Sequence, residues 1–214
     1  MTNHTLTLAS ASPRRKELLA SLYNNFTVLA VDIEEVPSPL ESPADYVSRL
    51  AEEKALAGLS RLKNSSSNSW VLGADTIVVC DNKILEKPRD FSDFSATMNL
   101  LSAREHQVMT AICLTSSEQL FSKRVVTAVN FRPLTELDIR NYWQTDEPKD
   151  KAGGYGIQGI AARFVQSITG SYSAVVGLPL CETEALLKRA GFECAMFKAA
   201  LPNNTDTALA EEKE

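Results

Sequence analysis

Apolar residues in the first part of the chain alternate between continuous runs, typical of buried strands, and the three-to-four-residue spacing of amphipathic helices. Ser12-Pro13 and Ser42-Pro43 each place a capping residue before a proline suited to the first helical position, so we expect a helix to begin at each. The second helix runs to about Leu62. Strands are predicted around these helices, over Leu6–Ala9, Phe26–Ile33 and Trp70–Cys80.

The second part of the chain mixes strands that look like a hairpin with further helices. Two β-rich runs joined by Ser-Ser-Glu-Gln predict an antiparallel hairpin, and a glycine-rich loop lies further along the chain. The hairpin strands are expected over Gln107–Thr115 and Leu120–Phe131, and later strands over Phe164–Ile168 and Tyr172–Val176. Helices are expected over Ser92–Ser102, from Thr135 to about Gln144, and in a last segment that ends before Gly191.

Helices interleaved with strands of both kinds predict an α/β fold: a mixed sheet flanked by helices, with two lobes and a central cleft. We expect residues 1–201 to form one domain with two lobes. The acidic tail over residues 202–214 has no apolar periodicity and is expected to be disordered, and the serine-rich loop over Lys63–Ser69 to be mobile.

Composition narrows the class of protein. The net charge of −5 and a pI near 5.2 argue against a general nucleic-acid or membrane-surface binder, which would carry a basic excess. The four cysteines have no CxxC spacing and only two histidines are present, so no zinc site is expected and the thiols should be reduced. The chain shows neither a signal peptide nor an apolar run long enough to span a membrane, and a cytoplasmic location is expected.

Three cations, Arg14, Arg15 and Lys16, crowd the predicted first turn of the helix that begins at Pro13. The helix dipole makes cations unfavourable there, at roughly 0.3–1 kcal/mol each. A bound anion would make these cations favourable, because free backbone N–H groups and guanidinium forks suit phosphate oxygens. The segment is therefore either a phosphate site or a solvated basic turn.

Two charged residues stand where apolar ones are expected. Asp75 interrupts the apolar strand Trp70–Cys80, where an ionised carboxylate requires a cation or a hydrogen-bond network, unless it marks a strand end or a bulge. Lys54 shares a helical stripe with Val47 and Leu50, so it points toward the core. Its ammonium either snorkels to solvent or extends into a cleft.

The segment Lys151–Gly159 contains G-x-G-x-x-G but does not fit a dinucleotide-binding fingerprint. The residues before it are hydrophilic and those after it look like a strand, whereas the fingerprint follows an apolar strand and opens a helix. No Gly-Lys-Ser/Thr ends it, so it is not a P-loop either. We expect the glycines to let backbone approach a ligand, with Gln158 as a polar reader and Lys151 as a further cation.

Taken together, five ordered segments resemble the signature segments of the Maf nucleoside triphosphate pyrophosphatases. They are Leu8–Arg15, Gly73–Val78, Glu86–Asp90, Asp150–Gly159 and Val176–Pro179. The resemblance implies hydrolysis of a nucleoside triphosphate to monophosphate and pyrophosphate with a divalent metal, Mg²⁺ or Mn²⁺. The expected partner is the nucleotide substrate, and whether the chain forms a homodimer is left open.

The resemblance also implies roles for individual residues. Asp75 would be the catalytic base and, with Glu35, would lie at the metal, while Ser10, Arg15, Lys54 and Lys87 would surround the phosphates. Arg14, Thr76 and Gln158 resemble the set found in the branch that acts on dTTP and UTP, or on modified pyrimidine nucleotides. A regulatory protein linked to septum formation, sensing nucleotides in the same cleft, is the alternative function.

Overall fold

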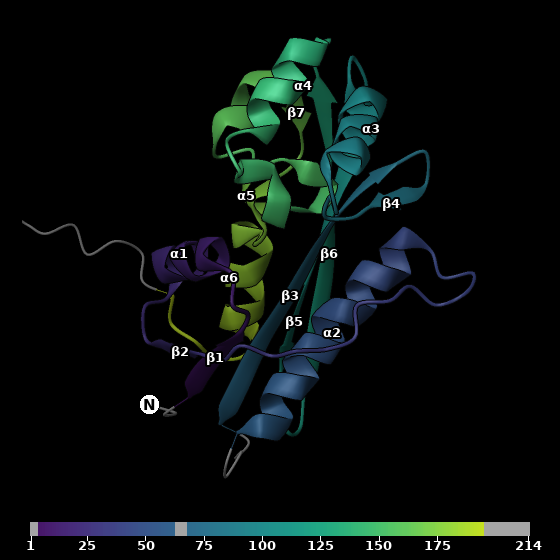
Figure 1. Cartoon of the computed structure of the whole chain (residues 1–214). Helices are drawn as coiled ribbons and strands as arrows, with labels where there is room; N and C mark the ends of the chain where they lie inside the picture. The colour runs from purple at the N-terminus through teal and green to yellow at the C-terminus, as the bar shows by residue number, and fades with distance from the viewer. Residues whose placement is uncertain (1–3, 63–67, 195–214) are drawn as a thin grey trace, which may run out of the picture.

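The structure, a computed structural model, describes residues 4–62 and 68–194 and is organised around a seven-stranded mixed sheet (Figure 1). The strand order is β2-β1-β3-β5-β6-β7, with β4 paired to one end of β3. β1 is parallel to β2 and β3, and the other pairs are antiparallel, as expected for a mixed sheet. The strands are β1 (Thr5–Ala9), β2 (Phe26–Val28), β3 (Ser69–Cys80), β4 (Lys83–Leu85), β5 (Glu105–Thr115), β6 (Leu120–Phe131) and β7 (Val165–Thr169).

Side-chain caps fix where most of the helices begin. The hydroxyls of Ser12, Ser42 and Thr135 and the carboxylate of Asp90 each accept a hydrogen bond from a backbone N–H in the first turn. The helices are α1 (Pro13–Leu22), α2 (Pro43–Arg61), α3 (Phe91–Leu101), α4 (Glu136–Trp143), α5 (Tyr172–Val176) and α6 (Leu180–Arg189). Short 3₁₀ segments occupy η1 (Glu147–Asp150), η2 (Ala152–Gly154) and η3 (Ile160–Phe164).

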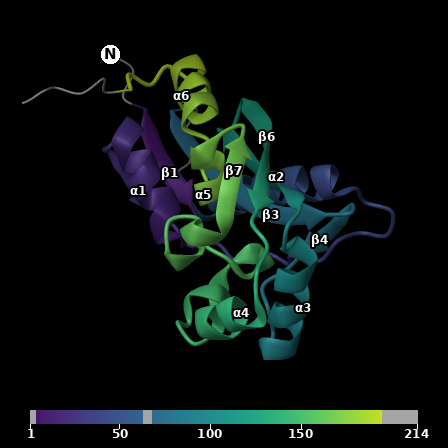
Figure 2. The same ribbon diagram turned by 90° about the horizontal axis from the view of Figure 1, so that it is seen from above.

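The long strands β3, β5 and β6 carry two lobes, one toward each end (Figure 1). In the first lobe, α1 and α6 cover one face of the sheet and α2 covers the other, which Figure 2 shows from above. In the second lobe, α3, α4 and the 3₁₀ segments pack on the far ends of the same strands. The predicted α/β fold with two lobes is therefore confirmed.

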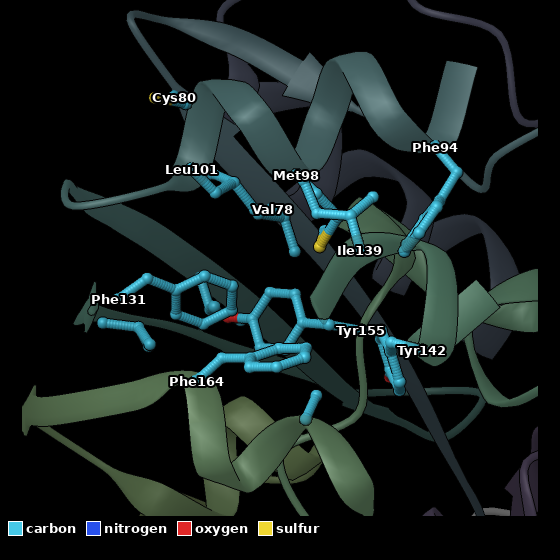
Figure 3. Packing of buried hydrophobic residues seen from close by; sticks show 13 residues of the cluster. Val78, Cys80, Phe94, Met98, Leu101, Phe131, Ile139, Tyr142, Tyr155 and Phe164 are labelled. Carbon is cyan, nitrogen blue, oxygen red and sulfur yellow. The ribbon is translucent and has the colours of Figure 1, made fainter. Parts of the chain in front are cut away.

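The second lobe has an aromatic core centred on Tyr155 (Figure 3). The rings of Phe131 and His106 pack edge-on against it, with centroid distances of 4.8 and 5.5 Å. The Tyr155 hydroxyl lies 2.8 Å from Nε2 of His106. Tyr155 belongs to the glycine-rich loop, so this core anchors the loop to the sheet.

The strand predicted over Phe26–Ile33 ends early, at Val28. β2 is an edge strand whose neighbour is β1, and it pairs only from Phe26 opposite Leu6 to Val28 opposite Leu8. One residue beyond this pairing, β1 ends at Ala9 and the chain turns into α1. Without a partner strand, the chain after Val28 leaves the sheet and crosses toward α2.

The strand predicted over Tyr172–Val176 is wrong, because these residues form the short helix α5. The Ser171 hydroxyl caps the helix by accepting from the N–H of Ala174, and Gly177 ends it with a φ of 128°. The β-branched pair Val175-Val176 favours a strand by local propensity. Caps at both ends of the segment override that preference.

Smaller differences follow from pairing between distant residues. The prediction did not include β4, and Phe164 belongs to η3, so β7 begins one residue later than expected.

The four cysteines are free thiols, with Cys80 and Cys113 buried. Among residues 4–62 and 68–194, no helix is both long and apolar enough to cross a bilayer. The predicted disordered tail and all but the last two residues of the predicted mobile loop lie outside the described residues.

Burial of His106 predicts that stability falls in mild acid. Desolvation lowers the pKa of its imidazole from 6.5 to about 4, so the unfolded chain binds the proton more readily than the folded one. The stability that comes from keeping His106 neutral in the folded protein is fully present above pH 6.5 and is lost as the pH falls toward 4. Between pH 7.5 and pH 5 the group should remove about 2 kcal/mol from the free energy of unfolding.

Urea unfolding at both pH values, with wild type and His106→Gln, measures this effect. The difference between pH 7.5 and pH 5 should be about 2 kcal/mol smaller in the variant. An equal pH dependence in the two proteins would show that His106 is not the group responsible.

Candidate active site

The cleft lies at an open stretch of one edge of β3. Along this edge β3 pairs with β1 as far as Gly73, opposite Ala9, and with β4 only from Val78, opposite Leu85. Among the described strands, none pairs with this edge between these two points. Because successive side chains of a strand point to opposite faces, Asp75 and Thr76 reach the opening from different sides.

The opening is a cleft of about 690 Å³, within the size range of small-molecule sites. Segments from both lobes line it, including the end of β1, the start of α1 and the glycine-rich loop. The residues predicted from the sequence for catalysis and binding all line it: Ser10, Arg14, Arg15, Glu35, Lys54, Asp75, Thr76, Lys87 and Gln158. Their individual roles remain predictions.

An ion-pair cluster joins α2, β3 and the loop before α2. Nζ of Lys54 lies 2.6 Å from Oδ1 of Asp75 and 2.6 Å from Oε1 of Glu35. Asp75 and Lys54 are buried, with 6% and 9% of their surface exposed. Partial burial raises the pKa of Glu35, but the hydrogen bond and charge of Lys54 outweigh it and leave the pKa below its usual value. The inward direction predicted for Lys54 and the partner required by Asp75 are both confirmed.

The loop that carries Glu35 is fastened to α2 by contacts that the sequence analysis missed. Oη of Tyr46 donates to the backbone carbonyl of Glu35 at 3.0 Å. Arg49 donates to both carboxylate oxygens of Glu41, at 2.7 and 2.8 Å, and to the carbonyl of Val36 at 3.1 Å. An arginine and a tyrosine on a helix carry no local signal of this role, because their partners lie in an irregular segment.

Arg15 is held by groups from three parts of the fold. Its guanidinium donates to the carbonyl of Gly177 at 3.0 Å, to the hydroxyl of Ser10 at 3.3 Å and to the hydroxyl of Thr76 at 3.1 Å. The described residues thus engage three of its five N–H donors and leave two for a ligand. Desolvation lowers the pKa of Arg15, an effect that the Asp75 carboxylate opposes.

Thr76 is fixed in turn by Thr110, which lies opposite it on β5. Their hydroxyl oxygens are 3.0 Å apart, and the Thr110 hydroxyl lies 2.7 Å from the carbonyl of Ala174. The chain of hydrogen bonds from Arg15 through Thr76 and Thr110 therefore ends on α5. Neither Thr110 nor the Gly177 carbonyl could be identified from local sequence.

Three further predicted residues line the cleft at more open positions. Nη1 of Arg14 lies 4.0 Å from Oδ2 of Asp150, a pair in which both side chains are partly exposed. Lys87 is exposed in the loop after β4, and Gln158 is exposed in the glycine-rich loop. These side chains can contact a ligand without the cost of breaking a buried pair.

Lys151 lines the cleft as a further cation, as expected, but its ammonium is already engaged by the protein. Its ammonium donates to the carbonyl of Glu147 at 2.7 Å and lies 2.6 Å from Oδ1 of Asp150. The glycines around it also serve packing. Gly153 and Gly154 have φ of 65° and 68°, and a Cβ on Gly153 would lie 2.8 Å from the side chain of Val78.

The cluster of Asp75, Lys54 and Glu35 provides part of a ligand set for a hard divalent cation. Glu35 and Asp75 already direct one oxygen each toward the Lys54 ammonium, so their carboxylates can converge on a cation. Within the described residues, no group of three His, Cys, Asp or Glu side chains is placed to hold a metal. Two carboxylates suit Mg²⁺ or Mn²⁺ when phosphate oxygens and water supply the remaining ligands.

Proteins similar to this chain match it over most of its length. A protein from Vibrio vulnificus strain YJ016 named dTTP/UTP pyrophosphatase is 54% identical over 184 residues, which cover 86% of this chain and 97% of the relative. Relatives of the same name from Vibrio parahaemolyticus and Vibrio cholerae are 55% and 50% identical over 86% and 88% of this chain and 96% and 100% of their own lengths.

Among solved structures, the Staphylococcus aureus Ham1 protein overlaps 59% of this chain and 71% of its own, with a TM-score of 0.43 and 13% identity, too remote to inform the fold. The model of the family described as Maf-like protein matches residues 5–190. The chain therefore belongs to the Maf family.

Proposed function

We propose that this protein hydrolyses the pyrimidine nucleotides dTTP and UTP to the monophosphate and pyrophosphate. The observation that carries the proposal is the cluster of Asp75, Lys54 and Glu35 beside Arg15 in a cleft of nucleotide size. The printed name of the relatives, dTTP/UTP pyrophosphatase, supports the same substrates. A nucleotide sensor would use the same cleft without turnover.

The charges of the cleft suit a polyphosphate. Five cations and four carboxylates line the cleft, so it has a positive excess of one charge before any metal binds: Arg14, Arg15, Lys54, Lys87 and Lys151 against Glu35, Asp75, Glu147 and Asp150. Phosphate oxygens entering the cleft would give Lys54 an alternative anion and free an oxygen of Asp75. The guanidinium of Arg15, already oriented by Ser10 and Thr76, can offer its remaining donors to the same phosphates.

In the proposed reaction a water molecule attacks the α-phosphorus and Asp75 accepts its proton. The bond from the α-phosphorus to the bridging oxygen breaks, and pyrophosphate leaves with the electron pair. Lys54, Arg15 and Lys87 would stabilise the negative charge that develops on the pyrophosphate. A divalent cation held by Glu35 and Asp75 would, when bound, supply further positive charge at the phosphates.

The direct test is product analysis with dTTP and UTP, with and without Mg²⁺ or Mn²⁺. We expect monophosphate and pyrophosphate only when metal is present. Asp75→Asn should lower kcat by at least about 10²-fold, the effect of losing a general base. Orthophosphate and diphosphate as first products, or nucleotide binding without turnover, would contradict the proposal. A thermal melt of the variant checks that it folds.

The two lysines assigned to the phosphates should differ in their effect on stability. Lys54→Met leaves the buried Asp75 carboxylate without its cation and should cost about 3 kcal/mol of unfolding free energy at pH 7. Lys87→Met, the same change at an exposed position, should cost less than about 0.5 kcal/mol. Urea unfolding compares them, and equal costs would mean that Asp75 does not depend on Lys54.

Gln158 is proposed to read the pyrimidine edge. Uracil and thymine present an N3–H donor beside carbonyl acceptors, which a glutamine amide complements and a carboxylate does not. Gln158→Glu should therefore lower kcat/KM for UTP by roughly 5- to 150-fold, the effect of one mismatched polar group. Gln166→Glu, the same change at an exposed position of β7, is the control. Unchanged UTP kinetics for Gln158→Glu would exclude this reading role.

A further inference from the structure

The glycine-rich loop is held in two halves by different parts of the second lobe. The first half packs on the core: Gly154 lies against Phe94, where an added Cβ would come within 3.0 Å of the ring. Gly153 donates its N–H to the carbonyl of Glu86 at 3.1 Å. The second half buries Ile157 but leaves Gln158 exposed, and hydrogen bonds on both sides of Gln158 define the position of the turn.

One carboxylate holds both ends of the turn that carries Gln158. On the far side of Gln158, the N–H groups of Ile160 and Ala161 donate to Glu147, at 2.9 and 3.5 Å. On the near side, the N–H of Gly156 donates to Oη of Tyr142 at 3.2 Å, and that hydroxyl donates to Glu147 at 2.8 Å. Gln158 lies at the middle of the segment between these anchors.

The sequence of the turn is adapted to the position of this carboxylate. An added Cβ on Gly159 would overlap the carboxylate of Glu147, and one on Gly156 would lie 2.8 Å from Cε of Lys151. The last two glycines of the G-x-G-x-x-G pattern therefore make room for side chains of the protein itself. This close approach explains why the pattern is present although the segment fits no dinucleotide fold.

Glu147 is itself held in place by its surroundings. Its carbonyl accepts from Nζ of Lys151 at 2.7 Å, and its N–H donates to the hydroxyl of Thr145 at 3.3 Å. It is half-buried and also lines the cleft. Because its carboxylate oxygens are used by the turn and by Tyr142, the side chain is oriented toward the loop.

We propose that Glu147 is a positioning residue for base recognition, acting through the turn that presents Gln158. The inference rests on the proposed function and adds a residue that contacts neither the phosphates nor the reacting atoms. A shift of about 1 Å in a substrate-positioning group can lower a rate by about 10²-fold, so a loosened turn should weaken recognition of the base. The residues assigned to the phosphates lie just after β1, on α1 and α2, and in the loop after β4, and their binding should be unaffected.

The test compares wild type with Glu147→Gln and Tyr142→Phe. Ile160 and Tyr142 donate to different oxygens of Glu147, and glutamine replaces one of these oxygens with an NH₂ group, so one of the two acceptors is lost. We expect kcat/KM for UTP to fall about 10-fold or more, and the preference for UTP over CTP to shrink by a similar factor. Tyr142→Phe removes the Gly156 anchor and one donor to Glu147 but leaves the hydrogen bond from Ile160 in place, so it should show a smaller change in the same direction.

Binding measurements without turnover separate positioning from general damage. Calorimetry with UMP, which carries the base, should show weaker binding to Glu147→Gln, whereas the Kd for inorganic triphosphate should stay within about twofold of wild type. Glu136→Gln, the same change on the exposed face of α4, should match wild type for both ligands. Melting temperatures are measured alongside.

Two results would overturn the inference. One is Glu147→Gln with unchanged UTP kinetics and an unchanged preference over CTP. The other is an equal loss of affinity for UMP and inorganic triphosphate, which would indicate a general structural role. Failure of wild type to release pyrophosphate from UTP would instead count against the proposed function, and the UMP and triphosphate comparison would still decide the role of Glu147.

Discussion

The fold depends on keeping one carboxylate neutralised inside an apolar strand. Asp75 lies in the middle of β3 with 6% of its surface exposed, and Lys54 reaches it from α2 at 2.6 Å. Because an unpaired buried charge is strongly destabilising, α2 must pack with this one face toward the strand. The same ammonium also holds Glu35. A requirement of folding thus assembles two carboxylates and a cation at the open edge of β3.

The parts of the site that could be predicted are those whose signal is local. Asp75 stands out because it interrupts an apolar run, and Lys54 because it occupies a core-facing position of a helix. The cations of α1 stand out because they oppose the helix dipole. In each case a residue conflicts with its own immediate surroundings, and such conflicts are visible without knowing what lies nearby in space. Composition alone would not have assigned them to one cleft; the resemblance to the Maf family did.

What could not be predicted depends on partners distant in sequence. β2 ends where β1 stops offering a partner, and α5 forms because capping by Ser171 outweighs the strand preference of its valines. The partners of the Lys151 cation, Asp150 and the backbone carbonyl of Glu147, could not be read from the sequence pattern. Glu147 is an acidic residue in a hydrophilic stretch, where nothing local separates it from a solvated side chain.

The continuous strands limit how the molecule can respond to a ligand. β3, β5 and β6 pass from one lobe into the other without a break (Figure 1). Closure of two domains usually relies on hinges, a few residues that absorb large changes in backbone angles. Here a rigid-body closure would have to bend three hydrogen-bonded strands at once. The continuous sheet therefore holds the two sides of the cleft at a fixed spacing, and the site is built for a ligand that fits it without closure of one lobe on the other.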